Sequence, residues 1–240
     1  KMKGAEIEFK KKSVGATGNT LMAAVGAEGT TKIKNAACEP DIASLAKFLV
    51  NMGAKIKGVG KPEIIIEGNK ELKAGFEFNI IPDRIEAGTF MIATAITGGE
   101  ITLHNVEPKH LQCIISCLRK TGSTVIVDEK SIYIKAGKKI LPFDITTSEY
   151  PGYPTDLQAQ WIVLMALAEG KSEVIDNIYT DRFTHIPELN RFGANIYLKQ
   201  NIATIMGVEQ LTGAPVMSTD IRASASLILG ALAANGKSQI

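Results

Sequence analysis

Residues 100–137 read EITLHNVEPKHLQCIISCLRKTGSTVIVDEKSIYIKAG, and the same kind of stretch occurs twice more along the chain. Residues 30–68 read TTKIKNAACEPDIASLAKFLVNMGAKIKGVGKPEIIIEG, and residues 171–207 read KSEVIDNIYTDRFTHIPELNRFGANIYLKQNIATIMG. In each stretch a short strand pattern ending in Asn leads into a helix, a glycine and two further strand patterns. The three Asn residues are Asn35, Asn105 and Asn177. Repetition of this kind predicts a domain assembled from similar units.

The helical part of the first two stretches carries its apolar residues at helical spacing, and in all three a glycine follows where a left-handed helix cap is expected. One apolar stripe consists of Ile42, Leu45, Leu49 and Met52, and another of Leu111, Ile114, Ile115 and Leu118. The glycines are Gly53, Gly122 and Gly193. We therefore expect one side of each helix to face a core.

A second, more apolar helix accompanies each unit and ends close to a glycine. We expect these helices to be buried, with mixed four-stranded sheets outside them. They span residues 19–28, 88–96, 156–169 and 223–234, and the closing glycines Gly29, Gly99, Gly170 and Gly236 are 70, 71 and 66 residues apart. The sequence therefore predicts an α/β fold built from repeated βαβαββ units of about 70 residues. Residues 71–79 are the expected internal boundary.

The composition is that of an ordinary folded protein, with 45% hydrophobic residues, 22% charged residues and a net charge of +2. So small a net charge gives no reason to expect a nucleic acid or a membrane surface as a partner. No signal peptide opens the chain, and no apolar run reaches the roughly 18 residues of a membrane span, so the cytoplasm is the expected compartment. Because the chain starts with Lys1 and stops at Ile240, where a new strand pattern begins, we expect both ends to be cut.

The three cysteines, Cys38, Cys113 and Cys117, lack the number and spacing of a secreted disulfide scaffold. Cys113 and Cys117 are four residues apart in a predicted helix, so their thiols share one face. A buried structural role is the favoured interpretation of this pair, and no metal site is expected.

Three of the tracts that begin the apolar helices carry an Asp at or just before the helix start, at Asp83, Asp156 and Asp220. The simplest interpretation is an N-cap, in which the carboxylate accepts hydrogen bonds from the first free amides. The recurrence supports a shared structural role without excluding an additional chemical one.

The tract at residues 11–19, KKSVGATGN, has no carboxylate at the corresponding place. It carries Lys11 and Lys12 before Ser13 and Gly15, and a helix start with free amides and lysines is suited to binding phosphate. A solvated basic turn is the alternative. Three arginines also stand at junctions between loops and helices, either as surface ion pairs or as ligand clamps, and they are Arg84, Arg182 and Arg222.

Six tracts together resemble the UDP-N-acetylglucosamine 1-carboxyvinyltransferase family of enolpyruvyl transferases. They are SVGATGN, EPDI, PDRIEAGTF, YPTDLQAQ, RFTHIPEL and TDIRASASL, and the likeness runs from about Lys11 to Ile240. The resemblance implies an inside-out α/β barrel of the enolpyruvyl transferase type, in which two domains share six such units. Residues 1–79 would be the last unit of one domain. Residues 80–240 would be two units and the start of the third unit of the other.

The resemblance also implies an activity. The family transfers the enolpyruvyl group of phosphoenolpyruvate to the 3′-hydroxyl of UDP-N-acetylglucosamine and releases phosphate, in peptidoglycan synthesis and hence in cell-wall formation, cell shape and division. The reaction is an addition followed by an elimination, without a cofactor. It needs a base near the sugar hydroxyl, an acid for the methylene carbon, and cations for the carboxylate and phosphates.

Matching the tracts residue by residue gives the expected site. Asp156 in YPTDLQAQ matches the base, and Asp220 and Arg222 in TDIRAS match an acidic and basic pair near phosphoenolpyruvate. Arg182 matches a further active-site arginine, and Ile178 matches a contact to the nucleotide. The nucleotide-sugar contact loop corresponds to Lys11, Lys12, Ser13 and Val14. Because the family's flexible loop with its catalytic Cys or Asp would precede Lys1, we expect the isolated chain to be inactive.

Two other classes of function remain open at this stage. One is a non-catalytic nucleotide-sugar binding module, and the other is a repeat protein that serves only for interaction. The related shikimate-pathway enolpyruvyl transferase shares the repeat but is not expected to share the six tracts. Asp and Arg side chains together at neighbouring helix starts favour the enzyme over a scaffold.

Overall fold

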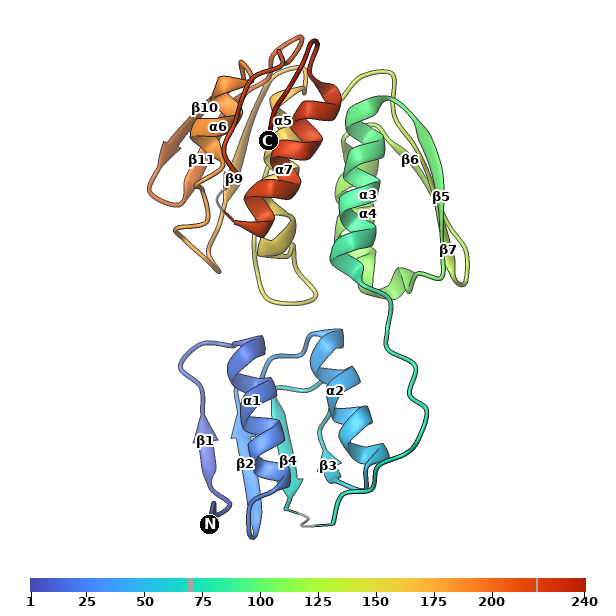
Figure 1. Ribbon diagram of the computed structural model, residues 1–240, viewed down its shortest axis with the longest axis vertical. Helices are drawn as coiled ribbons and strands as arrows, with labels where there is room; N and C mark the ends of the chain where they lie inside the picture. Colours follow the sequence, from blue (N-terminus) through green and yellow to red (C-terminus); the bar gives the residue numbers. More distant parts are fainter. Residues whose placement is uncertain (69–70, 219) are drawn as a thin grey trace. The chain divides into compact units, whose positions relative to one another are not determined.

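The computed structural model describes residues 1–68, 71–218 and 220–240. The chain divides into two compact units, Lys1–Ile81 and Pro82–Ile240. In the first unit two helices lie on one face of a four-stranded sheet with the strand order β1-β2-β4-β3 (Figure 1). The strands are β1 (Glu6–Glu8), β2 (Thr30–Lys34), β3 (Lys55–Lys57) and β4 (Glu63–Glu67), and the helices are α1 (Val14–Val25) and α2 (Pro40–Asn51). β1 runs parallel to β2, and the other pairs are antiparallel.

The core of the first unit follows from the alternation of its strands. In β2 and β4 every second residue is buried, and in β4 the buried pair is Ile64 and Ile66. Leu21 of α1 and Ile42 of α2 are buried in the same hydrophobic cluster. Burial of apolar side chains from both layers is the main stabilising contribution to such a unit.

The second unit contains two repeats and a further helix. Its first part has α3 (Arg84–Thr97), β5 (Glu100–His104), a 3-10 helix (Pro108–Leu111), α4 (Gln112–Lys120), β6 (Thr124–Val127) and β7 (Ser131–Lys135). Its second part has β8 (Ile145–Thr146), a 3-10 helix (Thr155–Leu157), α5 (Gln158–Ala166), β9 (Lys171–Ile175), α6 (Ile186–Arg191), β10 (Asn195–Lys199), β11 (Ile202–Met206) and α7 (Ile221–Ala233). One sheet has the order β5-β7-β6 and is antiparallel, and the other has the order β10-β11-β9-β8 with β8 parallel to β9.

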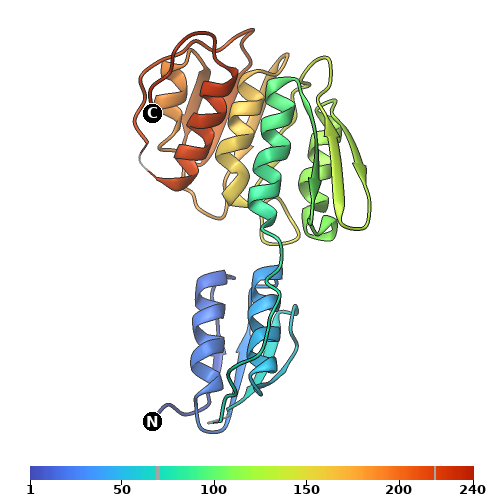
Figure 2. The same ribbon diagram turned by 45° about the vertical axis from the view of Figure 1, so that its right-hand side comes forward.

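Three helices, α3, α5 and α7, lie side by side in the second unit, with the sheets outside them (Figure 2). Every residue of α5 is buried, and most of α3 is buried, as the sequence predicts. The prediction is wrong for the outer sides of α1 and α7, where Met22, Ile228 and Leu232 are exposed. Among the described residues α1 packs mainly against α2, β4 and β2, and α7 packs mainly against α5, α3 and α6.

The sheet β5-β7-β6 has three strands where four were predicted. In the first and third sheets the extra strand, β1 or β8, comes before the apolar helix and pairs in parallel. The corresponding residues before α3 belong to the connection between the units. Phe76 and Phe78 contact Phe48 of α2, and the Lys73 amide donates to the Met52 carbonyl. This segment is therefore held by the first unit and adds no strand to the second.

The predicted repeat is confirmed at its glycines but needs one correction. Gly53, Gly122 and Gly193 have φ of 101°, 100° and 86°, in the left-handed region that favours glycine. Asn35 and Asn105 directly follow β2 and β5 and are also left-handed. In the third copy β9 ends at Ile175, so Asp176 rather than Asn177 is the equivalent residue. No helix of the described part of the chain is long and apolar enough to cross a membrane.

Candidate active site

Asp156 lies at the centre of a cluster of charged side chains in the second unit. It is in the 3-10 turn that leads into α5, and its side chain is 32% exposed. Its Oδ1 accepts a hydrogen bond from Arg182 Nη1 at 2.7 Å and one from Arg222 Nε at 3.1 Å. The predicted N-cap role is therefore wrong, because Pro154 precedes the turn and Asp156 stands inside it, where its carboxylate faces the two guanidinium groups.

The two arginines come from different elements. Arg182 follows β9, and its guanidinium carbon lies 5.0 Å from the centre of the Tyr179 ring, a cation–π distance. Its Nη1 also donates to Thr155 Oγ1 at 3.3 Å. Arg222 is in the first turn of α7. One carboxylate thus joins the starts of α5 and α7 to the loop after β9, and the remaining guanidinium N–H groups are suited to bind an anion.

Asp220 caps α7, as the sequence predicts. Its Oδ1 accepts from the amides of Arg222 at 2.8 Å and Ala223 at 3.0 Å, and its Oδ2 accepts from Thr184 Oγ1 at 3.0 Å. Burial by itself would raise the pKa of Asp220, but the hydrogen bonds from Ala223, Thr184 and Arg222 outweigh it and lower the pKa below its usual value. Asp220 therefore stays ionised beside Arg222. Thr219 of the same tract lies outside the described residues.

His185 lies buried beside this cluster and was not singled out from the sequence. It is 1% exposed, and its ring stacks on Phe183 with 6.3 Å between the ring centres. The pKa of His185 is lowered to about 4, mainly by burial; the Asp220 charge opposes this lowering, and the Arg182 charge adds to it. At pH 7 the imidazole is neutral, so it adds no positive charge to the cluster.

Ile178 lies on the turn after β9 that also carries Arg182. Its side chain is 45% exposed, and its amide donates to Asp176 Oδ1 at 3.0 Å. An exposed apolar side chain beside exposed Tyr179 forms a surface on which a flat ring could lie. The structure therefore places four predicted residues, Asp156, Arg182, Asp220 and Arg222, in one cluster, with Ile178 on an adjoining turn.

The other predicted residues are in the first unit, at the start of α1. Ser13 is the N-cap of α1, and its Oγ accepts from the Ala16 amide at 3.2 Å. The first turn holds no acidic residue, and Lys11 and Val14 are exposed. Lys12 is half-buried. A helix start with free amides, nearby lysines and no carboxylate is suited to binding an anion.

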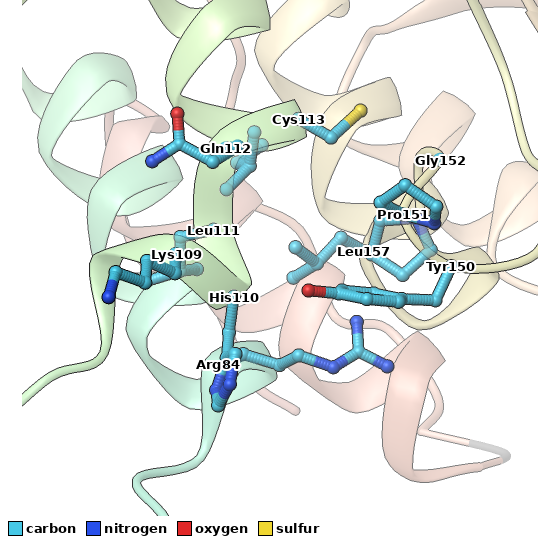
Figure 3. A pocket seen from close by; sticks show the side chains of 12 residues that line it. Arg84, Lys109, His110, Leu111, Gln112, Cys113, Tyr150, Pro151, Gly152 and Leu157 are labelled. Atoms are coloured by element: carbon cyan, nitrogen blue, oxygen red, sulfur yellow. The ribbon is translucent and has the colours of Figure 1, made fainter. Parts of the chain in front are cut away.

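Arg84 belongs to a different place from the Asp156 cluster. Its guanidinium carbon lies 5.7 Å from the centre of the Tyr150 ring, at the wall of a small pocket that Lys109, His110 and Cys113 also line (Figure 3). The enclosed space is about 20 Å³, which is room for about one water molecule. This pocket is too small to hold a substrate.

The thiols of Cys113 and Cys117 interact on α4. Their hydrogen bond lowers the pKa of Cys113 to about 7 and raises that of Cys117. Cys113 and Cys117 form no disulfide. In the part of the chain that the structure describes, no three His, Cys, Asp or Glu side chains are arranged to hold a metal ion.

The repeat, the three apolar helices side by side and the charged cluster at the starts of α5 and α7 define an enolpyruvyl transferase fold. Residues 1–240 match the EPSP synthase (3-phosphoshikimate 1-carboxyvinyltransferase) family, and the chain belongs to that family. The structure is similar to the enolpyruvyl transferase NikO from Streptomyces tendae, with a TM-score of 0.82 and 26% identity over 92% of this chain and 53% of that one. It also has the fold of EPSP synthase from Acinetobacter baumannii, with a TM-score of 0.69 and 20% identity over 98% of this chain and 57% of that one. The predicted fold class is confirmed.

Sequence identity shows which members of the family the chain resembles. The chain is 52% identical over 240 residues to UDP-N-acetylglucosamine 1-carboxyvinyltransferase from Pelodictyon phaeoclathratiforme and 51% identical over 240 residues to that from Chlorobium chlorochromatii. It is 48% identical over 242 residues to the one from Bartonella henselae. The resemblance inferred from the six tracts is thereby confirmed. All of this chain is covered, and it spans 56% of the length of each of these relatives.

Proposed function

We propose that the protein carrying this chain transfers the enolpyruvyl group of phosphoenolpyruvate to the 3′-hydroxyl of UDP-N-acetylglucosamine and releases phosphate, in peptidoglycan synthesis. The observation that supports it best is Asp156, whose Oδ1 binds two arginines 2.7 and 3.1 Å away at the start of a buried helix. A carboxylate beside cations suits a reaction between a hydroxyl and an anionic, phosphorylated substrate. The identity of about half to enzymes named for this reaction supports the choice of substrate.

Asp156 is the proposed base. Because both arginines bind Oδ1, the described residues leave Oδ2 to accept the hydroxyl proton. The hydroxyl oxygen then bonds to the second carbon of phosphoenolpyruvate while a proton adds to the methylene carbon, which gives a tetrahedral ketal. Loss of phosphate and of a proton from the new methyl group regenerates the double bond. No electron carrier is needed to balance these steps, and the proposal includes no cofactor.

The other predicted residues have supporting roles in the proposal. Arg182 and Arg222 stabilise the charges of phosphoenolpyruvate, and ionised Asp220 keeps the Arg222 end of the cluster in place. Ile178 contacts the nucleotide. The start of α1, with Lys11, Lys12, Ser13 and Val14, contacts the nucleotide sugar.

The organisation of the whole protein is part of the same proposal. Residues 1–79 are proposed as the last unit of one domain, and residues 80–240 as two units and the start of the third of the other. The cytoplasm is the proposed compartment, because the number and spacing of the cysteines are not those of a secreted disulfide scaffold. Cell-wall formation, cell shape and division would follow from the reaction.

The test uses the complete protein that carries this chain, with phosphoenolpyruvate and either UDP-N-acetylglucosamine or 3-phosphoshikimate. Phosphate release and the mass of the product are measured. We expect phosphate and a product heavier by the enolpyruvyl group with UDP-N-acetylglucosamine alone. Turnover with 3-phosphoshikimate alone would move the protein to the activity for which its family is named. Binding of UDP-N-acetylglucosamine without turnover would make it a nucleotide-sugar binding module.

A further inference from the structure

Asp176, the residue directly after β9, is a buried carboxylate that joins three segments of the second unit. It is 0% exposed. Its Oδ1 accepts from Thr147 Oγ1 at 2.7 Å and from the amides of Ile178 at 3.0 Å and Tyr179 at 2.9 Å. Its Oδ2 accepts from Thr155 Oγ1 at 2.6 Å. The carboxylate therefore ties the end of β8, the turn before α5 and the loop after β9 together.

A carboxylate in this position is costly unless its oxygens are well paired. Removing such a group from water costs several kcal/mol, and short hydrogen bonds from several donors are what offsets the cost. The four donors of Asp176 meet that requirement. An apolar side chain could fill the same space without this cost. Asp176 is therefore better explained by the positions in which it holds its hydrogen-bond donors.

Two of the residues that Asp176 binds, Thr155 and Tyr179, also contact Arg182 of the Asp156 cluster. Thr155 precedes Asp156, and its Oγ1 also accepts from Arg182 Nη1 at 3.3 Å. Tyr179 supplies the ring over which Arg182 lies, at 5.0 Å. Asp176 thus fixes the two groups that flank the Arg182 guanidinium, and that guanidinium holds Asp156 Oδ1 at 2.7 Å.

We infer that Asp176 is a positioning residue, which acts through Thr155 and Tyr179 to place Arg182 and Asp156 for the reaction. It also orients the turn that carries Ile178. This inference rests on the proposed function, because it assigns the residues of that same site. Asp176 itself touches no reacting group.

The other copies of the repeat support a role specific to this place. The equivalent residues, Asn35 and Asn105, are left-handed and carry an amide instead of a carboxylate. Asn35 donates from Nδ2 to the Phe9 carbonyl, which is a local contact between strand ends. The third copy alone combines a carboxylate here with the arginine cluster among the described residues.

The experiment compares Thr155→Val with Thr147→Val in the complete protein. Each substitution removes one hydroxyl hydrogen bond to Asp176 and keeps the shape of the side chain, but only Thr155 also contacts Arg182. We expect Thr155→Val to lower kcat by roughly 10- to 100-fold, since small displacements of catalytic groups have effects of that size. Thr147→Val loses a hydrogen bond to Asp176 and the acceptor of the Asn177 amide. It leaves Thr155 in contact with Arg182, so it should lower kcat much less than Thr155→Val. Thr155→Ser, which retains the hydroxyl, should restore most of the turnover.

A second measurement does not depend on turnover. The Nε–H resonance of the Arg182 side chain, assigned with Arg182→Lys, reports where the guanidinium lies. We expect it to shift in Thr155→Val and to shift less in Thr147→Val. An unchanged resonance in both variants, or equal losses of kcat, would overturn the inference. A complete protein that releases no phosphate even without substitutions would instead overturn the proposed function, and the resonance would still show whether Asp176 places Arg182 through the Thr155 hydroxyl.

Discussion

The starts of α3 and α5 have similar sequences, yet their aspartates have different partners. Asp83 is the N-cap of α3, and its Oδ1 accepts from the amides of Ile85 at 2.7 Å and Glu86 at 3.1 Å. Asp156 accepts from two arginines instead. In the first tract Asp follows Pro directly, as PDR, whereas in the second Thr155 stands between them, as PTD. One inserted residue moves the carboxylate from the cap position into the turn, where it is available for chemistry.

The largest expected effect is at Asp156 and tests whether its role differs from that of Asp83. Asp156→Asn in the complete protein should lower turnover by roughly 100-fold or more, because an amide cannot accept the hydroxyl proton. The free energy of unfolding should fall by only about 1 kcal/mol, because the amide oxygen of Asn still accepts hydrogen bonds from the two arginines and the ion pairs that are lost are partly exposed. Phosphate release and thermal unfolding are measured on one preparation.

Asp83→Asn is the matched control for that substitution. Asn caps helices about as well as Asp, so both turnover and stability should stay close to their original values. Near-normal turnover of Asp156→Asn would remove Asp156 from the role of base. A large loss in both variants would show that the two helix starts share one role.

A second prediction concerns the start of α7, where His185 lies beside Asp220 and Arg182. Burial lowers the pKa of His185 to about 4 in the folded protein, while an unfolded His has a pKa near its usual value of about 6.5. The stability from the neutral imidazole is therefore complete above about pH 6.5 and is lost as the pH falls toward about 4. Between pH 7 and pH 5 the free energy of unfolding should fall by roughly 2 kcal/mol from this group.

Chemical denaturation at several pH values checks this contribution. His185→Gln should flatten the pH dependence, because the replacement does not bind a proton in this range. His104→Gln, at an exposed position of β5, is the control for the replacement of a histidine by glutamine. If the slope is the same with and without His185, the buried imidazole is not the group that titrates.

Much of the fold and part of the site follow from local patterns in the sequence. Helix caps depend on neighbouring residues, so Asp83, Asp220 and the glycines Gly53 and Gly122 are found from sequence alone. The sequence pattern points to Asn177, which matches Asn35 and Asn105 by residue type, and not to Asp176 one residue earlier. Because β9 ends at Ile175, Asp176 is the first residue after the strand, and its buried carboxylate is not recognisable from the sequence pattern.

The remaining errors have the same physical origin in contacts between distant residues. His185 resembles any other residue of a short helix until Phe183, Asp220 and Arg182 are placed around it. The segment before α3 belongs to the first unit, where Phe76 and Phe78 contact Phe48 of α2. Neither set of contacts can be read from the spacing of apolar residues within one helix or strand.

A third prediction extends the comparison to α1, whose start carries lysines in place of an aspartate. Lys11→Ala in the complete protein should weaken the binding of UDP-N-acetylglucosamine by roughly 1–3 kcal/mol, the contribution of a charge-assisted hydrogen bond. Titration calorimetry measures the dissociation constant. Lys47→Ala, an exposed position on α2, removes the same charge and should have little effect. Equal dissociation constants for both variants would leave Lys11 as part of a solvated basic turn.

The smallest expected effect tests the cap at Asp83. Asp83→Ala removes the acceptor of the Ile85 and Glu86 amides, and the loss of such a cap costs about 1 kcal/mol of stability. Asp83→Asn should recover most of that loss, because its side-chain oxygen accepts the same two hydrogen bonds. The free energy of unfolding is obtained from urea denaturation at neutral pH. An equal loss in both variants would mean that the charge of Asp83, and not its position at the helix start, stabilises α3, and the contrast with Asp156 would then lose its structural basis.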